Sequence, residues 1–341
     1  MYKNLLRMSR RLVRPRAVAH AFGRLGGLAA SALHASRPLA PLAGGRVVEE
    51  TSFGPNPGAL RMFLYVPASP PRPLAPLIVV LHGCGQHAKG FAAAAGWMLL
   101  ADRLGVPLLL PEQVAANNPG RCFNWFLPGD TRRDAGEAAS IRHMVAAAVA
   151  RFGADPGRVF VTGLSAGGAM AAVMLAAYPD AFAGGAVVAG VPVGAAANIS
   201  AAMACMAGGG PAHSPAAWAG LARSAGPSGF PGPWPRVSIW QGGADHTVAP
   251  ANAGHLVAQW RTLHRLAATP TADTRPSKGV RGKSWGVRRQ SWGDQLELVT
   301  LDAMGHGFPI DGVSQDRFCP DVGLDAAAAI ARFWKLRARA G

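Results

Sequence analysis

The sequence predicts an α/β fold in which a mostly parallel central sheet is covered by helices on both faces. Two observations predict this class. From about residue 59 onward, short and nearly continuous apolar runs alternate with segments of helical character. Half of the 341 residues are hydrophobic, which is enough to bury a large core. Strands that are apolar throughout are typical of a parallel sheet buried between two layers of helices.

Seven apolar runs have the length of buried strands. The first two, Ala59–Val66 and Leu77–Leu81, end at Pro or at a turn that contains Gly, as strands often do. The others follow at Val106–Leu110, Arg158–Thr162, Gly185–Ala189, Val237–Trp240 and Leu296–Leu301.

Five segments predict helices. Phe91–Leu104 is rich in Ala and Leu, with Gly96 as its only breaker, and we expect one continuous helix there. Asp134–Phe152 places apolar residues at helical spacing. The remaining helices are expected at Ser165–Tyr178, where Pro179 stops a run of small residues, Ala249–Leu266 and Asp325–Leu336.

Two stretches break the alternation. Residues 191–235 are rich in Ala, Gly, Pro and Ser and are a candidate cap over the site, whereas residues 268–292 are polar and basic and are expected to form a surface excursion. Neither stretch has the apolar content of an independent domain. We therefore expect one catalytic domain over residues 46–341, preceded by a basic leader over residues 1–45.

The leader contains two features of an export signal. Ser9-Arg10-Arg11-Leu12-Val13 resembles a twin-arginine signal, and Ala30-Ser31-Ala32 has the form of a cleavage site. The apolar segment that such a signal needs is interrupted by Arg16, His20 and Arg24. Export predicts an extracellular or periplasmic protein; the alternative is a disordered or amphipathic basic leader on a cytoplasmic one.

The formal charge of +16 is concentrated outside the body of the chain. Residues 1–46 hold nine Lys and Arg and no acid, and residues 260–290 hold eight against one acid, whereas residues 47–259 hold twelve basic and ten acidic residues. A nucleic-acid-binding protein carries its basic residues on a folded face, so this distribution argues against a nucleic-acid partner. No apolar run approaches the ~20 residues that span a membrane, and nothing in the sequence indicates an oligomeric state.

The four cysteines are too few for a disulfide scaffold. They are Cys84, Cys122, Cys205 and Cys319. No pair has C-x-x-C spacing, and no cluster of Cys and His resembles a zinc motif. We expect neither a metal nor a cofactor.

The strongest local signal is Gly163-Leu-Ser165-Ala-Gly167, a G-x-S-x-G pattern between an apolar strand and an Ala-rich helix. A serine hydroxyl is a weak nucleophile, so it needs a nearby base and a tight turn that holds it clear of the backbone. Small residues on both sides let strand and helix pack closely around such a turn. Ser165 is therefore the candidate nucleophile; the alternative is a Gly-rich turn that happens to contain a serine.

An acid and a histidine must follow the nucleophile in the chain. Asp245 lies in a Gly-rich loop five residues past a predicted strand and is the candidate acid; its alternative role is the N-cap of the helix near Pro250. His306 lies between two glycines after the last strand and is the candidate base. Asp302 and His246 are the next candidates.

The site also needs donors for the negative charge that develops on the substrate oxygen. One is expected to be the backbone N–H of Ala166, and the other that of Cys84, in the Gly-containing loop after the strand Leu77–Leu81. Cys84 itself is a poor candidate for the nucleophile, because nothing in the sequence places a base beside it.

Five blocks of the sequence together resemble the poly(3-hydroxybutyrate) depolymerase-family esterases, which are relatives of the feruloyl and acetyl xylan esterases. The blocks are LHGCGQ (81–86), PEQ…NNPGRCFNWF (111–126), TRRDAGEAASIRHM (131–144), VFVTGLSAGGAM (159–170) and GHGFP (305–309). The resemblance covers roughly residues 47–336. It implies the α/β-hydrolase fold, catalytic positions at Ser165, Asp245 and His306, and a disulfide between Cys84 and Cys122.

The function that follows from these residues and from the resemblance is ester hydrolysis by a serine enzyme through an acyl-enzyme. The implied substrate is a short-chain polyhydroxyalkanoate or its oligomers, with feruloyl or acetyl esters of plant polysaccharides as the alternative. The sequence shows no separate substrate-binding domain or Thr-rich linker, which argues against activity on solid, crystalline polyester. Two other classes fit less well: a serine peptidase usually carries a large accessory domain, and an inactive binding protein would normally have lost a triad member.

Asn124 and Trp125 are candidate substrate contacts. They lie close to Cys122 and precede another aromatic residue, Phe126. Aromatic and apolar side chains dominate the walls of small-molecule sites. The alternative for Trp125 is a core position under the loop.

Overall fold

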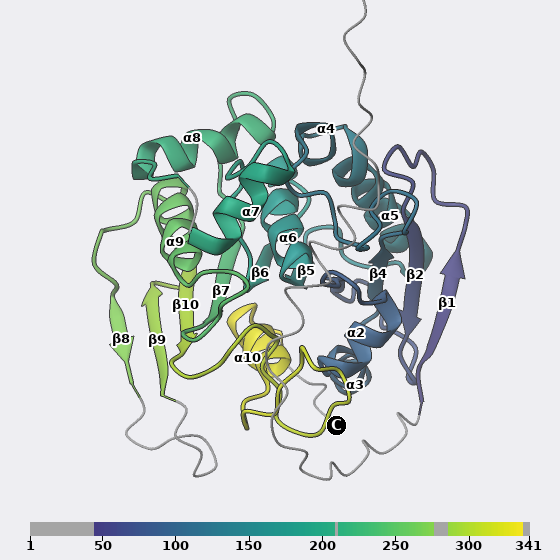
Figure 1. Ribbon diagram of the computed structural model, residues 1–341. Coiled ribbons are helices and arrows are strands. Elements are labelled where there is room, and N and C mark those ends of the chain that lie inside the picture. The colour runs from purple at the N-terminus through teal and green to yellow at the C-terminus, as the bar shows by residue number, and fades with distance from the viewer. Residues whose placement is uncertain (1–43, 209–210, 276–285, 337–341) are drawn as a thin grey trace, which may run out of the picture. The chain divides into compact units, whose positions relative to one another are not determined.

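The computed structural model describes residues 44–208, 211–275 and 286–336, which form a 10-stranded sheet with helices on both faces (Figure 1). The leader and its candidate export signal lie outside the described residues. The strands are β1 (Arg46–Glu50), β2 (Arg61–Val66), β3 (Leu77–Leu81), β4 (Leu108–Glu112), β5 (Val159–Leu164), β6 (Gly184–Val188), β7 (Arg236–Gly242), β8 (Ala272–Thr274), β9 (Val287–Trp292) and β10 (Leu296–Leu301).

The strand order is β1-β2-β4-β3-β5-β6-β7-β10-β9-β8. The central strands, from β4 to β10, pair in parallel, as the sequence predicted. Both ends of the sheet are antiparallel, with β1 and β2 at one end and β9 and β8 at the other. The sheet is therefore mostly parallel but carries an antiparallel extension on each side.

The helices lie in two layers, one on each face of the sheet (Figure 1). Strand β3 shows why both are needed, because Leu77, Val79 and Leu81 face one core and Ile78 and Val80 face the other, all fully buried. Helices α5, α6, α8 and α9 pack on the first core and α2, α3 and α10 on the second. The helices are α2 (Ala88–Ala94), α3 (Trp97–Leu104), α4 (Pro128–Thr131), α5 (Gly136–Phe152), α6 (Ala166–Ala177), α7 (Ile199–Gly208), α8 (Pro215–Ala225), α9 (Ala251–Leu263) and α10 (Ala326–Phe333).

The single helix predicted over Phe91–Leu104 is wrong, because the structure has two helices there, α2 and α3. Gly96 separates them with a φ of 78°. This left-handed conformation is open to glycine at little cost and cannot continue an α-helix. Gly96 therefore ends one helix and begins another, rather than lying inside a continuous helix.

The polar stretch 268–292 is not only a surface excursion, because it contains strands β8 and β9. Strand β9 pairs with β10 along its whole length, and Val287 and Trp292 at its two ends are buried. The four residues between them are only partly buried, which hides the strand from a search for continuous apolar runs. Strand β1, also half-exposed, escaped prediction for the same reason.

Residues 191–235, the candidate cap, contain helices α7 and α8. Helix α8 packs against α6 and α9, and its Trp218 is fully buried. Within the described ranges, no helix has the length and apolar character needed to cross a bilayer.

The parallel part of the sheet brings the predicted site residues to one edge. The carboxyl ends of β3, β5, β7 and β10 lead directly into the loops that contain Cys84, Ser165, Asp245 and His306. In parallel sheets these ends lie on the same side, where reacting groups are usually found. Residues that are far apart in the sequence therefore meet beyond one edge of the sheet.

Candidate active site

Ser165 occupies a one-residue turn between β5, which ends at Leu164, and α6, which begins at Ala166. Its φ of 58° and ψ of −118° are unusual for a residue with a side chain. Strain of this kind persists only where the surroundings impose it, and it is common at functional sites. Here the Ser165 N–H donates to the carbonyl of Val188 at 2.9 Å, and its own carbonyl accepts from Ala169 at 2.8 Å.

The glycines on both sides of Ser165 are required by close backbone contacts. A Cβ atom at Gly167 would lie 2.3 Å from the carbonyl oxygen of Leu81, and one at Gly163 would lie 2.3 Å from the carbonyl oxygen of Gly167. Both contacts are with backbone atoms, which cannot turn aside as a flexible side chain can. The G-x-S-x-G pattern therefore lets β3, β5 and α6 approach one another closely around Ser165.

Asp245 and His306 are joined by a hydrogen bond of 2.8 Å between Oδ2 and Nδ1. The other carboxylate oxygen, Oδ1, accepts the N–H groups of Thr247 and Val248, both at 2.8 Å. Gln241 Nε2 also donates to Oδ2, at 3.1 Å. The Asp245 side chain is fully buried and that of His306 is 9% exposed. Asp245 is thus fixed by four donors, one of which is His306.

The alternatives to this acid and base find no support in the geometry. Helix α9 begins after Pro250 without a side-chain cap, so Asp245 is not its N-cap. Asp302 is exposed and its carboxylate lies beside Gly286. His246 is exposed as well. Because β7 extends to Gly242, Asp245 follows the strand more closely than predicted.

The loops of Asp245 and His306 are packed directly on each other. A Cβ atom at Gly242 would lie 2.3 Å from the Met304 carbonyl oxygen and 2.4 Å from that of Gly305. Ala244 N–H donates to the Met304 carbonyl at 3.0 Å. Among the described residues no hydrogen bond joins Ser165 to His306; such bonds are often long until substrate is bound.

The loop after β3 lies against the nucleophile. A Cβ atom at Gly83 would lie 3.6 Å from the Cβ of Ser165 and 3.4 Å from the Leu164 carbonyl oxygen. The N–H of Gly83 already donates to Gln86 Oε1 at 2.8 Å. No hydrogen bond within the described ranges engages the N–H of Cys84 or of Ala166. These two N–H groups, which the sequence indicated as oxyanion donors, are therefore available.

A disulfide joins Cys84 to Cys122, with the two Cα atoms 4.3 Å apart, as the resemblance implied. Next to it, the N–H of Gly85 donates to the carbonyl of Gly120 at 2.8 Å. The loop after β3 is thus tied to the loop before Asn124. Cys205 and Cys319 are buried and free.

Asn124 and Trp125 are both 7% exposed. Trp125 packs edge-on against Phe126, with 5.4 Å between ring centroids. The Asn124 side-chain oxygen accepts from Asn118 Nδ2 at 3.0 Å. Both side chains are thus held by neighbours in the loop that the disulfide anchors, and their contact with substrate stays a prediction.

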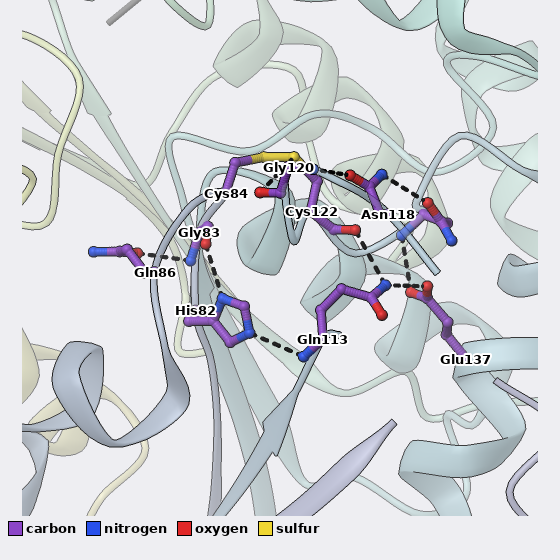
Figure 2. The surroundings of a disulfide bond; sticks show 10 residues. His82, Gly83, Cys84, Gln86, Gln113, Asn118, Gly120, Cys122 and Glu137 are labelled. Atoms are coloured by element: carbon purple, nitrogen blue, oxygen red, sulfur yellow. Dashed lines mark hydrogen bonds between the residues drawn. A yellow bond between two sulfur atoms is a disulfide. The ribbon is translucent and has the colours of Figure 1, made fainter. Parts of the chain in front are cut away.

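A buried polar network lies beneath these loops, and its members Gln113 and Glu137 escaped the sequence analysis, whereas His82 was expected to shape the turn after the strand Leu77–Leu81 (Figure 2). His82 and Glu137 are 0% and 1% exposed, and Gln113 lies between them. Burial lowers the pKa of His82 to about 4 and raises that of Glu137 to about 8. All three residues lie within the sequence blocks that carry the family resemblance, and those blocks were the only signal that could have found them.

Within the described residues, no group of three or more His, Cys, Asp and Glu side chains is arranged to hold a metal ion. A strained serine, a histidine hydrogen-bonded to a fixed carboxylate and two unengaged N–H groups are the kinds of group that acyl transfer needs.

Residues 60–278 match a family model described as esterase PHB depolymerase. The chain is 44% identical over 266 residues to poly(3-hydroxyalkanoate) depolymerase C of Paucimonas lemoignei, in a match that covers 78% of this chain but only 62% of that protein. It is 30% identical over 284 residues to feruloyl esterase B of Talaromyces stipitatus, covering 78% of this chain and 73% of that one. Among solved structures, an acetyl xylan esterase from Aspergillus awamori shares the α/β-hydrolase fold, with a TM-score of 0.73 at 24% identity over 86% of this chain and all of the other.

Proposed function

The chain belongs to the esterase PHB depolymerase family, and on this premise we propose that it is a serine esterase that hydrolyses carboxylic esters through an acyl-enzyme. The observation that carries the proposal is the pairing of the strained Ser165 with a histidine whose Nδ1 is held by a fully buried carboxylate. Family relationship and geometry support the same chemistry.

In this mechanism Ser165 Oγ attacks the ester carbonyl carbon while His306 Nε2 takes the hydroxyl proton. The C–O bond to the alcohol then breaks, and His306 returns the proton to the leaving alcohol. A water molecule, deprotonated by His306, hydrolyses the acyl-enzyme in the same way and releases the acid. The N–H groups of Ala166 and Cys84 stabilise the negative oxygen of both tetrahedral intermediates.

Asp245 orients the base. A carboxylate that already accepts three other hydrogen bonds cannot rotate, so its Oδ2 presents a fixed acceptor to the imidazole. The bond to Nδ1 leaves Nε2 of His306 as the nitrogen that can accept the Ser165 proton. It also stabilises the imidazolium that forms in each step.

The proposed substrate is a short-chain polyhydroxyalkanoate or its oligomers. The 44% identity to a protein named poly(3-hydroxyalkanoate) depolymerase C supports this class. The chain matches less than two thirds of that relative, so the support concerns the ester bond rather than a polymer surface. Feruloyl or acetyl esters of plant polysaccharides are the second candidate, favoured by the relative named feruloyl esterase B. In either case Asn124 and Trp125 are the proposed substrate contacts.

The proposed setting is an oxidising compartment outside the cytoplasm. The disulfide between Cys84 and Cys122 supports it, because disulfides persist mainly in exported proteins. The twin-arginine-like motif of the leader supports it from the sequence. Residues 46–341 are proposed to form one catalytic domain.

The test is hydrolysis of a panel of chromogenic esters and of hydroxybutyrate oligomers by the wild type and by Ser165→Ala. Removal of a serine nucleophile lowers turnover by several powers of ten, about 10⁶-fold in a well-studied case, and we expect a loss of that order with an unchanged melting temperature. A variant that kept a tenth of wild-type turnover would contradict the assignment of Ser165. Preference within the panel decides between the two substrate classes.

A further inference from the structure

The oxyanion donor Cys84 N–H belongs to a peptide unit that is shared with Gly83. A peptide is planar and trans, so the carbonyl of Gly83 and the N–H of Cys84 lie in one plane and point in opposite directions. A group that fixes the carbonyl therefore also fixes the direction of the N–H. Two groups contact this carbonyl. His82 Nδ1 lies 2.8 Å from the Gly83 oxygen (Figure 2), and the backbone N–H of Gln86 donates to the same oxygen at the longer distance of 3.3 Å.

The hydrogen bonds of His82 determine which ring nitrogen carries the proton. The backbone N–H of Gln113 donates to His82 Nε2 at 3.1 Å, so Nε2 must be unprotonated. In a neutral imidazole the other nitrogen then carries the hydrogen. Nδ1–H is consequently a donor, and the Gly83 carbonyl is its acceptor.

The surroundings keep the ring neutral and in place. His82 is fully buried, and burial lowers its pKa to about 4, so the ring is uncharged near neutral pH. Phe123 packs against it with 5.0 Å between ring centroids. Gln113, the residue that selects the tautomer, is itself held by hydrogen bonds from its side chain to the Cys122 carbonyl and to Glu137.

The second peptide of Gly83 is fixed from the opposite side. Its N–H donates to Gln86 Oε1 at 2.8 Å, and Gln86 Nε2 donates in turn to Asp316 Oδ2 at 2.6 Å. Gly83 thus has both of its backbone polar groups bound by side chains, whereas the N–H of the next residue, Cys84, has no hydrogen-bond acceptor within the described ranges. Side chains on both sides of Gly83 therefore add to the backbone bond from the Gln86 N–H to the Gly83 carbonyl in holding this turn.

We propose that His82 is a positioning residue for catalysis: its Nδ1–H holds the Gly83 carbonyl and thereby aims the Cys84 N–H at the oxyanion. The proposal rests on the proposed ester hydrolysis and adds to it the residue that orients one donor. A histidine that only filled the core would affect stability, whereas a positioning residue affects the transition state more than the bound substrate.

Two variants separate the two hydrogen bonds of His82. In His82→Asn the amide nitrogen takes the place of Nδ1, so the bond to Gly83 is kept and the bond from Gln113 is lost. In His82→Gln the amide oxygen takes the place of Nε2, so the bond from Gln113 is kept and the bond to Gly83 is lost. Loss of one oxyanion donor costs about 10²–10³-fold in kcat, so we expect the Gln variant to lose on the order of 10²-fold in kcat with KM nearly unchanged. The Asn variant is expected to retain activity within about tenfold of wild type.

A trifluoromethyl ketone supplies a second readout, because Ser165 adds to its carbonyl and creates the tetrahedral oxyanion. Its inhibition constant should rise in the Gln variant by about the same factor as kcat falls, and should change little in the Asn variant. Equal activity of the two variants, or a loss confined to KM, would overturn the proposal. If the wild type hydrolyses no ester, the proposed function itself is wrong. This outcome is distinct from failure of the role proposed for His82, which is judged by comparing the two variants of an active enzyme.

Because His82 is fully buried, a measurement on the unmodified protein accompanies the variants. Nitrogen-15 NMR of the histidine side chains at pH 7 should show His82 protonated at Nδ1 only. Protonation at Nε2, or at both nitrogens, would overturn the proposal even if neither variant folds.

Discussion

Asp245 is held by hydrogen bonds from its own loop and from His306, so substitution of either residue should have a specific effect on kcat. Asp245→Asn keeps the shape of the side chain but replaces one carboxylate oxygen by an amide that donates. The amide then competes with the N–H donors around it, and the imidazole loses its fixed acceptor. Removal of this charge in a comparable triad costs about 10⁴-fold in kcat, and we expect a similar loss here.

His306→Ala should impair turnover as severely, and neither change should add to that of Ser165→Ala, because the three groups act as one unit. Rate constants of the single and double variants on one chromogenic ester provide the measurement. Near-normal activity of either single variant would require a different triad, with Asp302 and His246 tested next.

Glu137 makes the stability of the fold depend on pH. Burial raises its pKa from 4.5 to about 8, although hydrogen bonds from the Asn124 N–H and from Gln113 partly oppose the shift. Between these two values the folded chain binds more protons at this residue than the unfolded chain. Protonation of Glu137 therefore stabilises the folded chain. Its contribution to the free energy of unfolding is fully present below about pH 4.5 and is lost as pH rises through about 8.

Glu137→Gln should remove this dependence, and it should lower stability by roughly 1–3 kcal/mol at pH 5.5, because an acceptor is replaced by a donor. The difference between the two proteins should become smaller at pH 8.5, where the wild type has lost the contribution of Glu137. Urea unfolding of both proteins at pH 5.5 and pH 8.5 measures how much the free energy of unfolding of each protein changes between these pH values. If the wild type and the variant lost the same stability between these pH values, Glu137 would not be the titrating group.

At the scale of elements, the elbow depends on close contact between β3, β5 and α6. Gly167→Ala places a methyl group 2.3 Å from the Leu81 carbonyl oxygen, so backbone must move beside the nucleophile. We expect a loss of about 1–3 kcal/mol in the free energy of unfolding and a large loss of kcat.

Gly254→Ala is the matched control for this change. Gly254 also lies in a helix, α9, but an added methyl group there meets nothing within 4 Å. It should leave activity unchanged and raise stability by up to about 1 kcal/mol through helix propensity. Equal effects of the two substitutions would show that the contact with β3 does not matter.

The disulfide connects the loop after β3 with the loop that contains Asn124. It closes a loop of 38 residues, for which the chain-entropy model gives roughly 3–4 kcal/mol. The Cys84→Ser, Cys122→Ser double variant should lose stability of this order, and its kcat should fall because the peptide that carries the Cys84 N–H is less firmly held.

Counting of thiols in denatured, unreduced protein tests whether the bond forms. Two free thiols are expected, from Cys205 and Cys319. Four in protein recovered from an oxidising compartment would exclude the disulfide and weaken the case for export.

At the scale of the whole molecule, the sequence predicted the elements whose apolar residues follow a regular pattern. The buried central strands and the helices between them were found because apolar runs mark them directly. Strands β1 and β9, which belong to the antiparallel ends of the sheet, were missed because they are only partly buried and their apolar residues do not form continuous runs. The break at Gly96 was visible, but a single glycine inside a helical pattern does not reveal its φ value.

The same contrast holds for the site. Ser165, Asp245 and His306 could be proposed because each follows a strand that the apolar pattern identifies. The contact between Gln86 and Asp316 spans 230 positions and leaves no local pattern. Nor does the bond from the Gln113 backbone to His82, since a backbone N–H has no sequence identity. Tertiary hydrogen bonds that orient a loop therefore cannot be predicted from a single sequence.

The two ends of the sheet bear on how the molecule behaves at high concentration. Among the described residues, β1 and β8 are the outermost strands, and each offers backbone groups to a neighbouring molecule. Both edges carry charge: Glu49 and Glu50 of β1 pair with Arg61 and Arg151, and Asp273 of β8 pairs with Arg288. Charged side chains on an edge strand oppose the addition of a further strand. A sheet of this width is thereby protected against edge-to-edge aggregation, and neutral substitutions at these acids are the changes that would promote it.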